Sequence, residues 1–123
     1  MRIYSFRNCL LNTLERRVIK NGDYLDLTPR TFDVLQLLIE KCGEIVTKDE
    51  MLRKVWNGSF VEESNLSVQV YRLRQSLGET RYEQYIETSF GSGYRFVAKV
   101  ELVKASPWNR QFPRRCRSMA QSV

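Results

Sequence analysis

Apolar and polar positions alternate along the chain in a way that predicts strands first, helices next and a hairpin last. Residues 3–6 and 16–20 read as short strands, and residues 24–27 alternate polar with apolar side chains as a half-buried strand does. Asn21 and Gly22 separate the last two runs, and this pair is typical of a two-residue β-hairpin turn. We therefore expect a small antiparallel sheet at the N-terminal end.

Two helices are predicted next, each from a cap at its start and an apolar face along its length. Thr28 precedes a proline, as an N-cap precedes the first helical position, and Gly43 is placed to end this helix in a left-handed conformation. Thr47 and Glu50 have the spacing of a capping box, in which each side chain satisfies a backbone N–H at the start of the second helix. The buried faces are expected to consist of Phe32, Leu35, Leu38, Ile39 and Cys42 in the first helix and Met51, Leu52, Val55 and Trp56 in the second.

A third helix, which begins between Glu62 and Asn65 and ends at Gly78, is predicted to have two different faces. At about 100° per residue, one narrow sector is entirely apolar and consists of Leu66, Val70, Leu73 and Leu77. The opposite sector holds Ser64, Val68, Tyr71, Arg72 and Gln75, with Ser67 and Arg74 on one flank and Asn65 on the other. These side chains can form hydrogen bonds, pair with phosphate or touch a thymine methyl group, as insertion into a DNA major groove requires.

A terminal hairpin follows the third helix after a polar connection. Residues 85–89 and 94–97 alternate as strands about Gly91-Ser-Gly93, where glycine permits a positive φ. Strands, three helices and a hairpin indicate an α+β fold, and the short loop between the second and third helices is typical of a helix-turn-helix. Because the end of the chain has no helical or strand period, we expect one domain over residues 1–104 and a disordered tail or linker over residues 105–123.

Charge is distributed unevenly between these two parts. The formal net charge is +6, but the last 19 residues carry four arginines and no acidic side chain. Residues 1–104 therefore hold 16 basic and 14 acidic side chains, a net charge of +2. Because the body of the protein is only mildly basic, an anionic partner has to be met by a local patch and not by overall charge. The Arg-rich tail is expected to be a linker or to have no binding role. The alternative is that it adds non-specific affinity for DNA.

Composition excludes several kinds of chemistry. The chain contains no histidine, so it has no imidazole base, no Ser-His or Cys-His nucleophile pair and no histidine metal ligand. Its cysteines, at positions 9, 42 and 116, match no metal or redox motif, and no apolar run approaches the ~20 residues that cross a bilayer. We therefore expect a cytoplasmic protein that is not an enzyme and has no cofactor, no metal and no membrane segment.

Four sequence blocks in a fixed order carry a resemblance to a known family. They are Leu27-Thr-Pro-Arg-Thr-Phe32 with Leu35 and Leu38; Val46-Thr-Lys-Asp-Glu-Met-Leu52 with Val55-Trp56; Val61-Glu62 leading to Val68-x-x-Tyr-Arg-Leu-Arg74 and Leu77; and Gly91-Ser-Gly-Tyr-Arg-Phe96. Over roughly residues 3–100 the chain resembles the OmpR/PhoB-type winged-helix DNA-binding domain, which occurs in response regulators and in ToxR/CadC-like transcription regulators. Four linked blocks are far more specific than any one of them alone.

The resemblance implies a winged helix-turn-helix that binds double-stranded DNA as part of a transcription regulator. The third helix, about residues 62–77, would enter the major groove, and the hairpin, about residues 85–97, would act as a wing on the adjacent minor groove or backbone. Positions that match the family's DNA contacts are Ser64, Asn65, Ser67, Val68, Tyr71, Arg72 and Arg74, with Thr88 and Phe90 near the wing. The loop 56–61 matches a segment that can touch RNA polymerase, and the family precedent is tandem binding of two copies on DNA.

Some of these positions have plain structural alternatives. Arg72 could lie on a solvated helix face, and Arg74 could pair with Glu62 or Glu63. Gln75 could read a base edge or be merely solvated, and Arg95 could be a structural or a phosphate partner. Val68 would touch a thymine methyl group or be shielded by another side chain.

The wing and the whole domain have alternatives too. Phe90 stands where relatives often carry a basic residue; it could wedge into a minor groove, although packing against the base of the wing is the favoured expectation. Ser64 and Tyr71 stand where arginine is frequent in the family, which predicts weaker affinity for the DNA backbone. The alternative function is an interaction module of the same fold that docks on RNA polymerase or another regulator.

Overall fold

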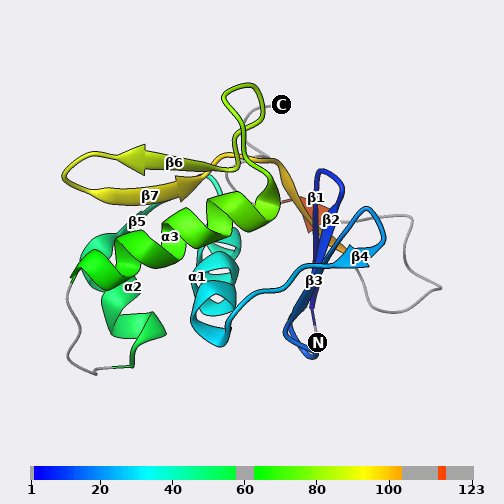
Figure 1. Cartoon of the computed structure of the whole chain (residues 1–123), viewed down its shortest axis with the longest axis horizontal. Helices are drawn as coiled ribbons and strands as arrows, with labels where there is room; N and C mark the ends of the chain where they lie inside the picture. Colours follow the sequence, from blue (N-terminus) through cyan, green and yellow to red (C-terminus); the bar gives the residue numbers. More distant parts are fainter. Residues whose placement is uncertain (1, 58–62, 104–113, 116–123) are drawn as a thin grey trace.

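The computed structural model describes residues 2–57, 63–103 and 114–115 (Figure 1). The strands are β1 Ile3–Phe6, β2 Cys9–Asn12, β3 Arg17–Lys20, β4 Asp23–Tyr24, β5 Ile45–Thr47, β6 Ile86–Ser89, β7 Gly93–Phe96, β8 Val100–Val103 and β9 Arg114–Arg115. The helices are α1 Pro29–Glu40, α2 Lys48–Val55 and α3 Glu63–Leu77. The predicted α+β order, with strands before three helices and a hairpin after them, is confirmed in this part of the chain.

An antiparallel sheet holds the two ends of the domain together. Its strand order is β4-β3-β2-β1-β8-β9, so β8 pairs with β1 although the helices and the wing lie between them in the sequence. The sequence patterns did not identify β2 or β8. The structure also places β9, which lies within the expected tail, against β8 at the edge of the sheet. The predicted domain boundary near residue 104 stays a prediction.

The hairpin of β6 and β7 extends alongside α3 as a wing (Figure 1). β7 also pairs with β5, the segment between α1 and α2, which makes a second sheet in the order β5-β7-β6. The pairing of β7 with β5 leaves no room for a side chain at Gly93, because an added Cβ would sit 2.0 Å from the carbonyl oxygen of Val46. The base of the wing is therefore fixed to the helical part of the domain.

Caps start the first two helices as predicted, with one difference. The Thr28 side chain accepts a hydrogen bond from the Thr31 N–H, and that of Thr47 accepts one from the Glu50 N–H at 3.1 Å. The Glu50 carboxylate does not complete the predicted reciprocal box; its oxygen lies 3.2 Å from the Lys54 ammonium group. Thr47 is also the last residue of β5, which pairs with β7.

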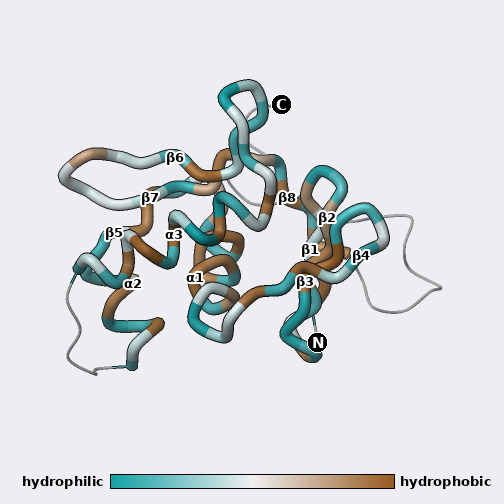
Figure 2. Tube along the Cα trace, in the orientation of Figure 1, coloured by the Kyte–Doolittle hydropathy of each residue, from teal (hydrophilic) through white to brown (hydrophobic). Residues whose placement is uncertain are grey.

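The core lies between the helices and the two sheets. Figure 2 shows hydrophobic stretches along α1 and the N-terminal strands, whereas the turns are mostly hydrophilic. The predicted apolar sector of α3, consisting of Leu66, Val70, Leu73 and Leu77, is buried. Phe6 meets the rings of Tyr85 and Phe96 edge-on at centroid distances of 6.2 and 5.2 Å, which joins the N-terminal sheet to the base of the wing.

Candidate nucleic-acid interface

The outer face of α3 is exposed over its full length. It carries seven of the residues predicted from the sequence: Ser64, Asn65, Ser67, Val68, Tyr71, Arg72 and Gln75. Val68 is 44% exposed and Tyr71 is 60% exposed, so the alternative in which another side chain shields Val68 is wrong for the described residues. Opposite a fully buried stripe, α3 thus presents hydroxyl, amide, guanidinium and methyl groups on one accessible surface.

Tyr71 and Gln75 form a local pair on this surface. The Gln75 side-chain N–H donates a hydrogen bond to the Tyr71 hydroxyl at 2.9 Å, one helical turn away. The tyrosine therefore keeps its own proton, and the glutamine keeps its carbonyl oxygen, for a further partner. This contact holds two long exposed side chains in a defined arrangement, which reduces the entropy lost when a ligand orders them.

Arg72 has no hydrogen-bond or ion-pair partner among the described residues. It lies beside a shallow hollow of about 180 Å³ between α3 and the segment that leads into α1. The lining consists of Asp26, Leu27, Thr28, Thr31, Arg72, Gln75 and Ser76. An exposed and unpaired guanidinium group on the outer face of a helix is available to an anion such as phosphate.

Arg74 is placed differently from Arg72. Its Nε lies 3.2 Å from a carboxylate oxygen of Glu79, and its Nη2 donates to the Thr88 hydroxyl at 2.8 Å and to the Ile86 carbonyl at 3.2 Å. Arg74 does have an acidic partner, but it is Glu79 and not the predicted Glu63. Glu63 pairs instead with Lys48, and residue 62 lies outside the described residues. Arg74 and Thr88, both predicted as DNA contacts, are thus joined to each other.

The tip and the base of the wing differ in exposure. Phe90 is 94% exposed, so the expectation that it packs against the base of the wing is wrong. The tight turn after β6 points its ring away from the core, which the sequence pattern did not indicate. Arg95 forms an ion pair with Glu87, its direct neighbour across β6 and β7, as the structural alternative for this residue proposed.

Lys48 is a residue near this surface that the sequence analysis missed. Its ammonium group lies 2.8 Å from the Glu63 carboxylate, and its backbone N–H donates to the Ser92 carbonyl oxygen at 3.3 Å. The side-chain hydrogen bond to Glu63 raises the pKa of Lys48 above its ordinary value. Lys48 therefore links the starts of α2 and α3 to the wing turn. Its place inside a capping sequence had indicated only a helix start.

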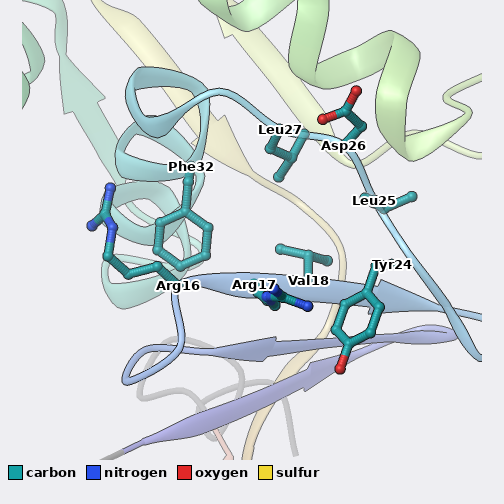
Figure 3. A pocket seen from close by; sticks show the side chains of 8 residues that line it. All are labelled: Arg16, Arg17, Val18, Tyr24, Leu25, Asp26, Leu27 and Phe32. Atoms are coloured by element: carbon teal, nitrogen blue, oxygen red, sulfur yellow. The ribbon is translucent and has the colours of Figure 1, made fainter.

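A second hollow, which shares Asp26 and Leu27 with the first, lies between the N-terminal sheet and α1 and has a volume of about 210 Å³ (Figure 3). The Arg16 guanidinium group lies 4.8 Å from the centre of the Phe32 ring and 2.8 Å from the Asp33 carboxylate. Arg17 lies 4.6 Å from the centre of the Tyr24 ring. Both arginines already have partners within the domain, so this hollow offers no chemistry beyond packing.

Residues 2–57, 63–103 and 114–115 contain no group of three His, Cys, Asp or Glu side chains that could hold a metal ion. None of the helices formed by these residues is both long enough and apolar enough to span a membrane.

Known proteins are similar to this chain both in sequence and in fold. The family described as "Transcriptional regulatory protein, C terminal" matches residues 22–96. The chain is 35% identical over 100 residues to the transcriptional regulator HilA of Salmonella typhimurium; the match covers 81% of this chain but 18% of HilA. The chain therefore spans about a fifth of the length of this relative.

Solved structures agree with this assignment. The DNA-binding domain of E. coli CadC has a TM-score of 0.72 and 26% identity, over 81% of this chain and 95% of that domain. The DNA-binding domain of Klebsiella pneumoniae RstA, in complex with the RstA box, has a TM-score of 0.68 and 28% identity, over 77% of this chain and 96% of that domain. The chain belongs to the OmpR/PhoB-type family of winged-helix domains of transcriptional regulatory proteins.

Proposed function

We propose that this chain is the DNA-binding part of a transcription regulator and recognises a specific sequence in double-stranded DNA. The observation that carries the proposal is the outer face of α3, where an unpaired Arg72 stands among exposed hydroxyl and amide groups opposite a buried apolar stripe. A helix of this kind fits the major groove, where each base pair presents a distinct pattern of donors, acceptors and methyl groups. Family membership supports the same assignment.

Within this proposal, each group on α3 has a chemical role. Arg72 binds a phosphate and sets affinity and its dependence on salt. Ser64, Asn65, Ser67 and Gln75 contact base edges or phosphates, and Val68 contacts a thymine methyl group. Tyr71 donates a hydrogen bond from its hydroxyl group to a phosphate oxygen. The wing, about residues 85–97, reaches the adjacent minor groove or backbone, where the exposed ring of Phe90 can insert between bases.

The partners of the complete regulator are part of the same proposal. A single small module buries only about 600–1,000 Å² on DNA, so useful specificity requires two copies on repeated half-sites. The loop 56–61 is proposed to touch RNA polymerase; of this loop, residues 58–61 lie outside the described residues. The regulator acts on DNA in the cytoplasm and carries out no catalysis.

One observation favours a second function, docking on a protein. Phe90 is 94% exposed at the wing tip, where a basic side chain would serve DNA binding better. Exposed aromatic residues are typical anchors of protein interfaces. In this alternative, the wing and α3 bind RNA polymerase or another regulator, and the domain has little affinity for DNA of its own.

Selection of bound duplexes from a random pool, at low and at moderate salt, tests the proposed function. We expect a repeated motif that survives moderate salt, because base contacts add to the salt-sensitive phosphate contacts. The spacing of the repeats would give the distance between half-sites. Recovery of duplexes without any shared motif, at both salt concentrations, would contradict sequence-specific binding by this chain.

Replacing Arg72 by alanine is expected to weaken binding to every duplex by about tenfold and to lower the slope of log affinity against log salt by about 1. The melting temperature should hardly change, because an exposed substitution usually alters stability by less than about 0.5 kcal/mol. Binding titrations at four salt concentrations and a thermal melt measure both effects. Arg17→Ala, on the exposed part of β3, is the matched control for binding and should leave the affinity for DNA and its salt slope unchanged. A large loss of melting temperature would show that Arg72 is structural.

A further inference from the structure

Arg74 turns away from the solvent-facing surface of α3 and toward the wing. Its side chain is 31% exposed, and three contacts occupy it: the Glu79 carboxylate at 3.2 Å, the Thr88 hydroxyl at 2.8 Å and the Ile86 carbonyl at 3.2 Å. Ile86 is the first residue of β6 and Thr88 is the third. One guanidinium group thus connects the last turn of α3 with most of the strand that begins the wing.

Glu79 holds this arginine in place. Its side chain is 13% exposed, and one carboxylate oxygen, Oε1, forms the ion pair with Arg74. The other oxygen, Oε2, accepts hydrogen bonds from the backbone N–H groups of Tyr85 and Ile86 at 2.8 and 2.9 Å. The Glu79 N–H donates to the Arg74 carbonyl oxygen at 3.0 Å, which completes a closed set of contacts. The carboxylate therefore ties the end of α3, the start of the wing and Arg74 together.

We propose that Arg74, held by Glu79, is a positioning residue that fixes the wing relative to the recognition helix and does not itself bind DNA. The inference rests on the proposed function and identifies how two separate DNA-contacting elements keep a common geometry. α3 and the wing can reach neighbouring grooves together only if their spacing is maintained, and β6 has its free edge on the side away from β7. The contacts of Arg74 with Ile86 and Thr88 hold β6 at a fixed distance from α3.

The opposite charges of Arg74 and Glu79 allow an experiment to distinguish a positioning role of Arg74 from binding of a phosphate. Glu79 neutralises Arg74, so a phosphate contact by Arg74 would require the ion pair to break and would leave a mostly buried carboxylate without its partner. If Arg74 were a phosphate ligand, removing the competing charge of Glu79 would strengthen DNA binding. If Arg74 is a positioning residue, removing the same charge weakens binding to the specific site. The two roles predict opposite signs for one substitution.

Glu79→Gln is the sharpest variant, because the side-chain carbonyl oxygen of glutamine can still accept hydrogen bonds from Tyr85 and Ile86 while the charge is lost. Affinity for the selected operator should fall about tenfold, with little change in affinity for an unrelated duplex and no change in the salt slope. Glu15→Gln removes an exposed acidic side chain from the turn between β2 and β3, outside α3 and the wing, and is the matched control. It should bind the operator as well as the wild-type chain or better.

Arg74→Lys provides a second variant that keeps the positive charge. Lysine lacks the planar fork that joins three acceptors at once, so it should lose operator affinity much as Arg74→Ala does. Arg74→Ala combined with Glu79→Gln should be no worse than the more severe single change, because both act on one set of contacts. Full rescue by lysine, a fall of about 1 in the salt slope for Arg74→Ala, or tighter operator binding by Glu79→Gln would overturn the proposal.

Hydrogen exchange in the free protein tests the same contacts without DNA. The amides of β6 and β7 should exchange faster in Glu79→Gln and Arg74→Lys, whereas those of α1 should keep their wild-type rates. If the wild-type chain selects no DNA sequence, the proposed function fails, and the exchange rates still decide whether this pair fixes the wing. Unchanged exchange in β6 in both variants would overturn the positioning role.

Discussion

Replacing Gly93 by alanine is expected to be among the most destabilising single changes in this domain. The new Cβ would lie 2.0 Å from the Val46 carbonyl oxygen and 2.8 Å from the Thr47 Cα, and both are backbone atoms that cannot rotate away. β7 would have to separate from β5, which detaches the wing from the helical core. We expect a loss of about 3 kcal/mol or more in the free energy of unfolding, measured by denaturant titration.

Gly91→Ala is the matched control for this experiment. Gly91 lies in the same hairpin with φ of +79°, and an added Cβ would meet no atom within 4 Å. Its cost should be only the strain of a left-handed backbone, about 1–2 kcal/mol. If the two variants lost the same stability, the close approach of β7 to β5 would not be what requires glycine at position 93.

Leu73→Ala is expected to have the second large effect. The side chain is fully buried in the middle of the apolar stripe by which α3 packs against α1. Removing it leaves a cavity and should lower the free energy of unfolding by roughly 2–5 kcal/mol. Denaturant unfolding of Leu73→Ala beside Arg72→Ala compares adjacent residues on opposite faces of one helix. A near-neutral Leu73→Ala would place the core on a different face of α3.

The periodic parts of the fold could be predicted from the sequence because periodicity depends on local geometry. The stripe Leu66, Val70, Leu73 and Leu77 repeats with the helical period, and all four residues are buried. Thr28 and Thr47 mark the starts of α1 and α2 because a side-chain cap acts within three residues. The outer face of α3 was found by the same argument, as the complement of its buried stripe.

The remaining features depend on contacts between distant parts of the chain. β8 is only four residues long and is defined by its pairing with β1, so no local pattern identifies it. The partner of Arg74 lies beyond the end of α3, where a helical projection does not extend. Phe90 lies in the turn between β6 and β7, and this hairpin is placed in the domain by the pairing of β7 with β5, a strand distant in the sequence.

The pairing of β1 with β8 also has a consequence for the order in which the domain can form during synthesis. Ile3 pairs with Val103, so β1 lacks this neighbouring strand until β8, at the other end of the domain, has been synthesised. Until then, β2 covers one edge of β1, while the other edge presents unpaired N–H and C=O groups beside Tyr4 and Phe6. During synthesis the domain therefore passes through a stage in which one edge of β1 is unpaired and prone to aggregation. This stage ends when residues 100–103 become available to pair with β1.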